Sequence, residues 1–489
     1  MKELAISEIV SYWAESQGER VAVFHAGETI TWNELELETN KLARAYESLG
    51  VGQDDFVTLA LPNGVEFFKS AIATWKLGAT PQPVSSKLPR FELEQIIELA
   101  NPAIIIGVGE EYANSRPSLK ENFAPGPEFS DEPLPKKVAK SFKVMTSGGS
   151  TGRPKLIVSG QDATWDLDSE EFWIQPKGSI LIPGPLYHNG PFLWAMSALF
   201  RGNQITLTSR FNALETLRLV EEQNVDMLYL VPTMMHRIWN LSEADKFSFD
   251  LSSLKVLWHL AAPCPEWLKE RFIEWLGADT IWELYGGTEG QGGTMISGYE
   301  WLSHRGSVGR ARSDCEIKIV DSNGDSVGPN TMGEVYMRPL SGQGSTYRYI
   351  GAEPREIKGG YESIGDLGWL DPEGYLYLAD RRTDMILSGG ANIYPAEVEG
   401  IIDSFQGVRS SAVIGLPDDD LGNVVHAIVD APLGLNAKEL LEHLTERLVR
   451  YKVPRSIELV TEPLRDEAGK VRRKQLRESR VGQTFSSLD

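Results

Sequence analysis

Over most of its length, the chain alternates between segments with the hydrophobic spacing of strands and segments with the hydrophobic spacing of helices. Between Thr29 and Pro62, a short alternating run is followed by apolar residues at helical spacing and then by the apolar run 56–61, which predicts a strand, a helix and a strand. A second helical run spans residues 65–77, and residues 103–108 predict another short strand. Strands that alternate with helices indicate an α/β fold with a largely parallel sheet.

The alternation resumes after residues 110–140, which are rich in Pro, Glu, Ser and Lys and predict a surface connection. From Gly309 onward, short strands separated by Gly turns predict a β-rich subdomain. Residues 380–390 predict a polar, Gly-rich joint, and the roughly 100 residues after it have the size and alternation of a small α+β domain. Further predicted strands beyond residue 160 are 179–183, 204–207, 227–231, 254–260, 316–320, 333–337 and 375–379.

The composition agrees with this pattern. The chain has 489 residues, of which 41% are hydrophobic and 24% charged, and these values are typical of a soluble globular protein with several domains or subdomains. No run reaches the roughly 18 apolar residues that a membrane-spanning helix needs. Residues 1–10 mix acidic with apolar positions, so we expect an amphipathic helix there and no secretory signal.

The formal net charge of −21 restricts the partners of the protein. Such a charge repels nucleic acid and anionic lipid, so we expect neither nucleic acid nor membrane as a partner, and an anionic small molecule needs a local positive site. Cys264 and Cys315 are far apart, and neither has Cys or His at metal-ligand spacing. This argues against a disulfide scaffold or a zinc site and predicts a reducing, cytoplasmic location.

Residues 146–155, Thr-Ser-Gly-Gly-Ser-Thr-Gly-Arg-Pro-Lys, lie between two runs that both predict strands, 141–146 and 155–159. Backbone amides left accessible by Gly suit a phosphate chain, and Lys155 adds a positive charge. The same loop offers the hydroxyls of Thr146, Ser147, Ser150 and Thr151.

Two other motifs compete for this loop. A Walker P-loop needs Gly-Lys-Ser/Thr opening a helix, but here Pro154 precedes Lys155 and a strand follows. Residues 148–152 match the Gly-x-Ser-x-Gly elbow of α/β-hydrolases, with His426 and His443 as candidate triad partners, yet the elbow also should open a helix. The remaining alternative is a flexible Gly/Ser loop without a ligand.

Two further segments carry groups that suit a nucleotide. In residues 285–290, Tyr285 could stack on a base, Thr288 could hold a phosphate oxygen and Glu289 could ligate Mg²⁺, although an ordinary Gly-rich turn has the same composition. Asp366 could take both hydroxyls of a ribose, and Arg381 could bridge sugar and phosphate. A solvated charged loop is the alternative for this second segment.

A basic cluster occupies residues 469–477 near the end of the chain. A solvated helix face or a weak anion patch is the ordinary interpretation of such a cluster. Lys470 follows Gly469, however, and a lysine at a loop tip could instead be inserted into a distant site.

In their order and spacing, five segments resemble the adenylate-forming superfamily of acyl-CoA synthetases, adenylation domains and luciferases: residues 146–155, 285–289, 365–366, 380–395 and 469–470. The resemblance extends from about Thr29 to Arg477. It implies an α/β fold with a large N-terminal domain, residues 1–383, of three subdomains: two α/β sheet layers and a β-rich one. A small, mobile α+β C-terminal domain, residues 384–489, would follow a hinge at Asp384.

The resemblance also implies roles for single residues. Lys470 would bridge the substrate carboxylate and the α-phosphate, Glu289 would hold Mg²⁺ and Thr288 would touch the α-phosphate. A carboxylate that attacks a phosphate brings two anions together, so positive charge is needed where negative charge develops. The implied ATP-binding residues are Thr146, Ser147, Gly148, Gly149, Ser150, Thr151, Lys155, Tyr285 against adenine, Gly286, Asp366 on the ribose and Arg381 beside it.

In the second step of such enzymes a thiol attacks the acyl-adenylate. Family members rotate the small domain about the hinge between the two steps, and Asp384 matches the hinge position. Gly389 and Gly390 would then border the thiol channel.

The sequence departs from the family pattern in two places. The pair Gly148-Gly149 has one glycine more than the usual phosphate loop, a variant that resembles bile-acid-type and natural-product acid–CoA ligases. Residues 464–469 lack the usual Thr and Ser, but Lys470 is retained.

The segment 185–190 resembles the acyl-pocket entrance of acid–CoA ligases and contains Tyr187, His188 and Asn189. Amino-acid-activating domains carry Phe-Asp there, so the missing Asp disfavours an amino-acid substrate. His188 is either a gating residue or a structural histidine. Gly287 stands where relatives often have a bulkier residue, so we hypothesise room for a bulky or cyclic acid.

We therefore predict an AMP-forming acid–CoA ligase that uses ATP, Mg²⁺ and coenzyme A. The alternative within the family is adenylation only, with transfer to a carrier protein or by a second enzyme of a natural-product pathway. Outside it, a hydrolase that uses Ser150 and a non-catalytic nucleotide-binding protein remain as rivals. A homodimer is compatible with this assignment.

Overall fold

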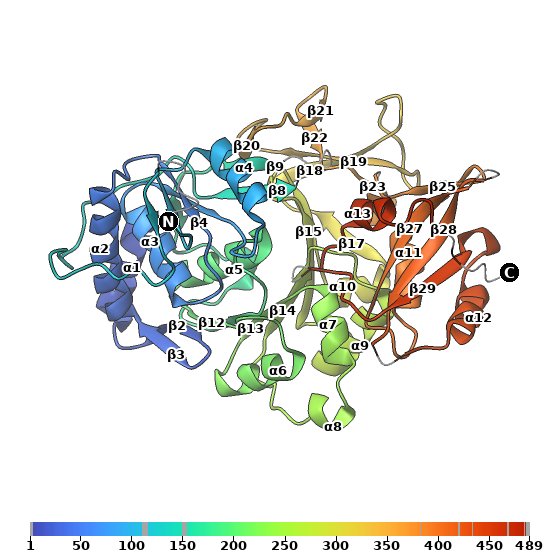
Figure 1. The fold of residues 1–489 in the computed structure, drawn as a ribbon, viewed down its shortest axis with the longest axis horizontal. Coiled ribbons are helices and arrows are strands. Elements are labelled where there is room, and N and C mark those ends of the chain that lie inside the picture. The colour runs from blue at the N-terminus through green and yellow to red at the C-terminus, as the bar shows by residue number, and fades with distance from the viewer. Residues whose placement is uncertain are drawn as a thin grey trace.

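The computed structural model describes residues 3–109, 116–148, 154–381, 383–418, 421–432, 434–466, 469–483 and 485. Buried apolar side chains form a large core whose members lie between Ile6 and Tyr375. A separate core begins at Ile386 and ends at Leu448. Figure 1 shows the corresponding large body and, at its side, the smaller C-terminal body.

The largest sheet has 15 strands. Its strands from β2 through β15 pair in parallel, and from β15 onward the pairing is antiparallel. The predicted β-rich subdomain therefore continues the parallel sheet, because β15 pairs with β16 and β17 with β24. In spatial order the strands are β21 (Arg355–Ile357), β22 (Tyr361–Ser363), β19 (Gly333–Pro339), β23 (Asp366–Leu370), β24 (Tyr375–Arg381), β17 (Ser307–Ala311), β16 (Gly293–Ser297), β15 (Ile281–Gly286), β14 (Val256–Leu260), β13 (Met227–Leu230), β11 (Ser179–Ile182), β12 (Gln204–Leu207), β2 (Val21–His25) and β3 (Glu28–Thr31), with β18 (Cys315–Val320) on β19.

A second, four-stranded parallel sheet follows the order β5 (Thr80–Pro83), β4 (Phe56–Leu59), β6 (Ile104–Ile106) and β7 (Ser118–Leu119). Helices α2 (Trp32–Ser48) and α3 (Val65–Lys76) confirm the helical spacing of the sequence. Helix α2 begins with a capping box, in which Thr31 and Glu34 satisfy each other's backbone N–H groups.

The remaining helices of the large body cover its sheets (Figure 1). The helix predicted near the N-terminus begins later than expected, because Glu3–Ala5 forms a short strand, β1, that pairs with β10 (Thr164–Asp166). These helices are α1 (Ile6–Gln17), α4 (Arg90–Ala100), α5 (Asn189–Phe200), α6 (Ala213–Glu222), α7 (Pro232–Trp239), α8 (Glu243–Lys246), α9 (Glu266–Leu276) and α10 (Gly298–Ser303).

A third, antiparallel sheet consists of β20 (Tyr347–Ile350), β9 (Pro154–Ser159) and β8 (Val144–Gly148). The loop predicted to bind phosphate connects β8 with β9, and Gly148 pairs with Pro154 across the hairpin. A strand therefore follows the loop, as the sequence predicts, and this context fits neither a Walker P-loop nor a hydrolase elbow.

The C-terminal body contains the antiparallel pair β27 (Ser410–Asp418) and β28 (Gly422–Asp430), with β29 (Ser456–Val460) parallel to β28. The hairpin of β25 (Ile386–Ser388) and β26 (Ala391–Ile393) precedes them. Its helices are α11 (Pro395–Ile402), α12 (Ala437–Arg447) and α13 (Arg473–Glu478). Within the ranges that the structure describes, every helix falls short of the length and apolar character needed to cross a bilayer.

Candidate active site

A cavity of ≈ 2470 Å³ lies beyond the carboxyl ends of the central strands and extends to the C-terminal body. Ligands of open α/β sheets bind at this end of the strands. Most of the site residues predicted from the sequence line it: Thr146, Ser147, Lys155, Tyr187, His188, Asn189, Tyr285, Gly286, Gly287, Thr288, Glu289, Asp366, Asp384 and Lys470.

The phosphate-loop candidates lie at one wall of this cavity. Thr146 and Ser147 lie near the end of strand β8, and the Gln82 amide donates to the Thr146 hydroxyl at 3.5 Å. Lys155 pairs with Ser147 on β9, so its side chain starts from the other side of the hairpin. The described residues include Gly148, whereas Gly149, Ser150 and Thr151 lie outside them.

Glu289 is buried and accepts hydrogen bonds from two directions. Lys155 Nζ lies 3.3 Å from Glu289 Oε1, and the Tyr349 hydroxyl donates to the same oxygen at 2.6 Å. Lys155 also stands 3.9 Å above the Tyr349 ring. Burial, and next the negative charge of Glu289, raise the pKa of Tyr349, so its phenol stays protonated as a donor.

The Glu289 carboxylate offers the kind of oxygen ligand that Mg²⁺ prefers. Mg²⁺ in nucleotide sites usually takes one or two carboxylates, with phosphates and water as its other ligands. The Glu289 carboxylate fits that requirement, because its second oxygen has no hydrogen bond to Lys155 or Tyr349. The described residues hold no cluster of three or more His, Cys, Asp or Glu side chains arranged around a metal position.

Tyr285 and Asp366 lie on different strands and meet in the cavity. The Tyr285 hydroxyl donates to Asp366 Oδ2 at 2.7 Å. The ladder between β23 and β24 pairs Asp366 with Arg381, so the two candidates for ribose binding are neighbours along the backbone. The side chain of Arg381 lies outside what the structure describes.

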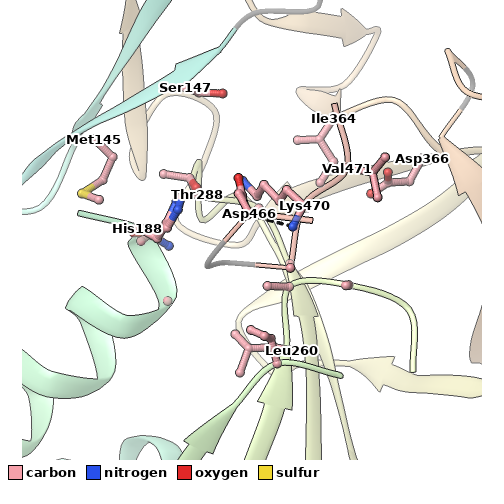
Figure 2. A pocket seen from close by; sticks show the side chains of 18 of the residues that line it. Met145, Ser147, His188, Leu260, Thr288, Ile364, Asp366, Asp466, Lys470 and Val471 are labelled. Atoms are coloured by element: carbon pink, nitrogen blue, oxygen red, sulfur yellow. Dashed lines mark hydrogen bonds between the residues drawn. The ribbon is translucent and has the colours of Figure 1, made fainter. Parts of the chain in front are cut away.

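Lys470 follows a tight turn of the C-terminal body. Asp466 N donates to Lys470 O at 3.0 Å, and Lys470 N donates to Asp466 Oδ1 at 2.9 Å. Gly469 has φ +78°, and a Cβ there would lie 2.9 Å from Thr233 Oγ1 on α7, so a larger residue would push the turn away from the large body. Figure 2 shows the Lys470 side chain extending toward Thr288 and His188.

The turn is held by a network of ion pairs around the buried Glu399. Glu399 accepts from Arg465 at 2.9 Å and from Arg473 at 2.8 and 2.9 Å. Burial raises the pKa of Glu399, but the guanidinium groups of Arg473 and then Arg465 lower it more, so the carboxylate stays ionised. Arg465 also donates to Gly469 O at 3.2 Å, and Arg473 donates to Asp384 Oδ2 at 2.9 Å.

His188 precedes helix α5 and points into the cavity (Figure 2). Its Nε2 atom is buried and has no hydrogen-bond partner among the described residues. Burial, and next the positive charge of Lys470, lower the pKa of His188 to about 4, and Asp466 opposes the shift. The ring is therefore neutral at pH 7, and the Tyr187 ring lies 4.4 Å from it.

Gly287 allows a close approach of its neighbours. A Cβ at this position would lie 2.8 Å from Glu289 Oε2 and 3.3 Å from Ile364. The Ile364 side chain therefore lies directly beside Gly287, and it also lines the cavity.

The two histidines that a hydrolase triad would use lie in the C-terminal body, away from the loop. His426 is fully buried and contacts Ser456 at 2.7 Å and Glu458 at 3.3 Å. His443 on α12 contacts Ser404 at 3.1 Å. Their contacts give the hydrolase alternative no support.

Gly389 and Gly390 form the turn between β25 and β26 and do not belong to the lining of the cavity. Sequence reasoning also missed residues that the structure brings to the site: Tyr349, Ile364, Glu399, Arg465 and the buried Lys143. Tyr349 reaches Glu289 because β20 pairs with β9, a pairing between residues almost 200 positions apart that no local pattern predicts.

Comparisons with known proteins agree with the geometry. A family model described as AMP-binding enzyme matches residues 10–347, and one described as AMP-binding enzyme C-terminal domain matches residues 397–470. The chain is 30% identical over 481 residues to feruloyl-CoA synthase of Amycolatopsis sp, which covers 93% of this chain and 95% of that protein. It is 29% identical over 481 residues to 2-succinylbenzoate–CoA ligase of Bacillus licheniformis, covering 95% and 98%.

The fold is also similar to a solved structure, o-succinylbenzoate CoA synthetase of Bacillus subtilis in complex with its acyl-adenylate intermediate. The TM-score is 0.82 at 24% identity, covering 99% of this chain and 100% of that one. The same enzyme has been solved with ATP and a magnesium ion. The names of the relatives favour transfer to CoA over adenylation alone. The chain therefore belongs to the AMP-binding enzyme family, in its acyl-CoA synthetase branch, and is an AMP-forming acid–CoA ligase that uses ATP and coenzyme A.

Proposed function

We propose that this ligase activates a bulky or cyclic carboxylic acid, with Lys470 bridging the substrate carboxylate and the α-phosphate of ATP. The observation that carries the proposal is the position of Lys470, which belongs to the C-terminal body yet lines the same cavity as Thr288 and His188. A cation at this point reduces the repulsion between the attacking carboxylate and the phosphate.

The other residues would position the nucleotide. The backbone and hydroxyls of residues 146–151 and the Lys155 ammonium would bind the β- and γ-phosphates, and Thr288 would donate to the α-phosphate. Tyr285 would lie against adenine, while Asp366 would accept from the ribose hydroxyls. Bound at Glu289, Mg²⁺ would neutralise charge on the phosphates and on the departing pyrophosphate.

The size of the acid follows from the lining of the cavity beside His188. Phe172, Trp194 and Leu193 supply flat or apolar surface to this part of the cavity, and Gly190 and Gly287 line it without side chains of their own. Feruloyl and succinylbenzoyl groups, named for the two relatives above, both contain a ring. These observations support a cyclic acid, and the neutral His188 would border its carboxyl end.

For the second step, we infer a rotation of the C-terminal domain, residues 384–489, about Asp384. Arg473 holds Asp384 in the present arrangement, in which Lys470 lies in the cavity and Gly389 and Gly390 lie outside it. After rotation, the two glycines would border the path of the CoA thiol.

Pyrophosphate exchange over a panel of acids tests the proposal. Acetate, hexanoate, benzoate and cinnamate are compared at equal concentration, and thioester formation is followed in parallel with and without CoA. We expect exchange with the ring-containing acids without CoA and thioester only with it. Strong preference for acetate would contradict the proposed acid class, and exchange without thioester would contradict transfer to CoA.

A cytoplasmic location and a homodimer remain predictions for this protein. Fractionation of the producing cell tests the first of them. Light scattering of the purified chain tests the second, since a dimer doubles the mass of 54.3 kDa.

A further inference from the structure

Lys143 is a buried cation in the wall of the active-site cavity. Its residue is 8% exposed, and it immediately precedes strand β8, two positions before Met145, which also faces the cavity (Figure 2). The ammonium group donates to Asn189 Oδ1, which is its only hydrogen-bond partner in the described part of the chain. An ammonium has three donors, so two remain for a ligand.

No carboxylate of the described residues forms an ion pair with Lys143. Glu171 is near enough to favour the charged ammonium, but its own ion pair is with Arg312, at 3.4 Å. Arg312 in turn binds Asp314 at 3.0 Å. Burial lowers the pKa of Lys143 to about 8, so the group still carries its charge at pH 7. A buried charge without a counter-ion is costly, and an anion from a ligand would compensate it.

Two further polar groups in the same cavity lack partners among the described residues. The Tyr229 hydroxyl and the Trp194 indole N–H are both buried and unpaired. Trp194 stacks on Phe172 at 4.1 Å and meets the Tyr229 ring at 5.6 Å. Because a Cβ on Gly190 would overlap the Tyr229 hydroxyl, this hydroxyl lies against the first turn of α5, beside Asn189.

Lys143 meets the beginning of α5 at Asn189, the Tyr229 hydroxyl lies against Gly190, and Trp194 follows about one turn later on the same helix. His188 borders the position of Lys470, and the next residue, Asn189, holds Lys143. Lys470, Lys143, Tyr229 and Trp194 all line this one cavity, so an acid whose carboxyl group lies at Lys470 can extend its other end toward Lys143.

We infer that the acid activated here carries a second carboxylate at the end remote from the adenylated one, and that Lys143 binds it as its counter-ion. Tyr229 and Trp194 would donate to the same carboxylate, and Asn189 would orient the ammonium. The inference rests on the proposed function, since it defines the acid that the ligase takes. A neutral hydroxyl at that end would leave the Lys143 charge uncompensated, so the charge favours an anion.

Matched pairs of acids test this assignment. Terephthalate is compared with para-methylbenzoate, and para-carboxycinnamate with para-methylcinnamate, and kcat/KM for pyrophosphate release is measured for each. We expect the wild-type enzyme to prefer the carboxylated member of at least one pair by tenfold or more. In Lys143→Met, which removes the charge at similar volume, we expect this ratio to fall at least tenfold or to reverse.

Two other variants make the result specific. Lys140→Met removes an exposed lysine three positions away and should leave the ratio unchanged. Lys143→Gln keeps a hydrogen-bond donor without the charge, and it should lose the preference as Lys143→Met does. Circular dichroism and ATP binding show whether each variant is folded. If Lys143→Met and Lys143→Gln are not folded, Lys143→Arg, which keeps the charge, is tested instead and should retain the preference.

Equilibrium dialysis of the same matched pairs without ATP gives a readout that does not depend on turnover. A wild-type enzyme that prefers the para-methyl acids in both assays would overturn the second carboxylate. Absence of exchange with every acid would contradict the proposed function, while dicarboxylate binding that depends on Lys143 would still support this site. Exchange with monocarboxylates alone would support the proposed function and contradict the second carboxylate.

Discussion

Arg473 donates to Asp384 at 2.9 Å, so the predicted hinge residue is bound to the helix that begins three positions after Lys470. The same guanidinium group binds Glu399, which also holds Arg465 beside the Lys470 turn. The hinge, the turn and the lysine are therefore connected through one network of ion pairs around the buried Glu399. A change at any of its members should affect both the stability of the C-terminal body and the position of Lys470.

Arg473→Met should destabilise the C-terminal body by about 2–4 kcal/mol, because Glu399 would remain buried with one counter-ion fewer. Urea denaturation measures the loss in the free energy of unfolding, with proteolysis of the C-terminal body as the probe of its unfolding. Lys474→Met is the matched control, since Lys474 is exposed and its pair with Glu478 spans 4.0 Å. Equal effects of the two variants would show that the network adds nothing.

Lys470→Ala should reduce acyl-adenylate formation by about a hundredfold or more, since the positive charge lies where the reacting anions meet. Pyrophosphate exchange measures the first half-reaction, and calorimetry of ATP binding should give a dissociation constant within a few-fold of wild type. Lys474→Ala again serves as the control. Unchanged exchange in Lys470→Ala would remove this lysine from the mechanism.

Tyr285→Phe should weaken ATP binding by about tenfold, because a hydrogen bond to a charged group contributes about 1.5–3 kcal/mol and this one orients the Asp366 carboxylate. The variant keeps the ring, so the contact with adenine is preserved. Titration of the enzyme with ATP checks the effect against Tyr299→Phe, which alters an exposed tyrosine. An equal affinity in both variants would mean that the hydroxyl has no part in nucleotide binding.

Glu289→Gln should raise the Mg²⁺ concentration needed for half-maximal exchange by tenfold or more, because an amide oxygen is a weaker ligand for this cation than a carboxylate. Removal of Mg²⁺ with a chelator should stop exchange in the wild-type enzyme. Tyr349→Phe is compared with Glu289→Gln, because it removes a hydrogen-bond donor to Glu289 but retains the Glu289 carboxylate. A wild-type Mg²⁺ dependence in Glu289→Gln would place the metal on other ligands.

The pKa of His188, about 4 in the folded protein, should make stability depend on acid pH. The unfolded chain binds a proton at this histidine near its ordinary pKa of about 6.5, whereas the folded chain does not until near pH 4, so stability falls as the pH drops through this window. Between pH 7 and pH 5, the free energy of unfolding of His188→Asn should therefore fall by about 1–2 kcal/mol less than that of the wild type. Urea denaturation at the two pH values measures this, and parallel losses would contradict the buried, neutral ring.

Local sequence patterns were sufficient for many of the elements. The strand, helix and strand of residues 29–62 are present, and so is the helix at 65–77, because apolar periodicity and the cap formed by Thr31 and Glu34 act over neighbouring residues. The hairpin context of the phosphate loop also follows from strand-forming residues on both sides of it. The order and spacing of the motifs indicate an adenylate-forming enzyme without any tertiary contact.

Only the tertiary structure decided which groups meet. Tyr349 and Glu289, Tyr285 and Asp366, and Lys143 and Asn189 are each separated by tens of residues, and they come together through strand pairing and helix packing. Nothing near Lys143 in the sequence marks it as a cavity residue, since its significance comes from burial without a carboxylate partner. Sequence by itself thus determined the reaction class and the local elements, because both depend on short segments. The shape and charge of the acid pocket depend on side chains from distant segments and required the folded chain.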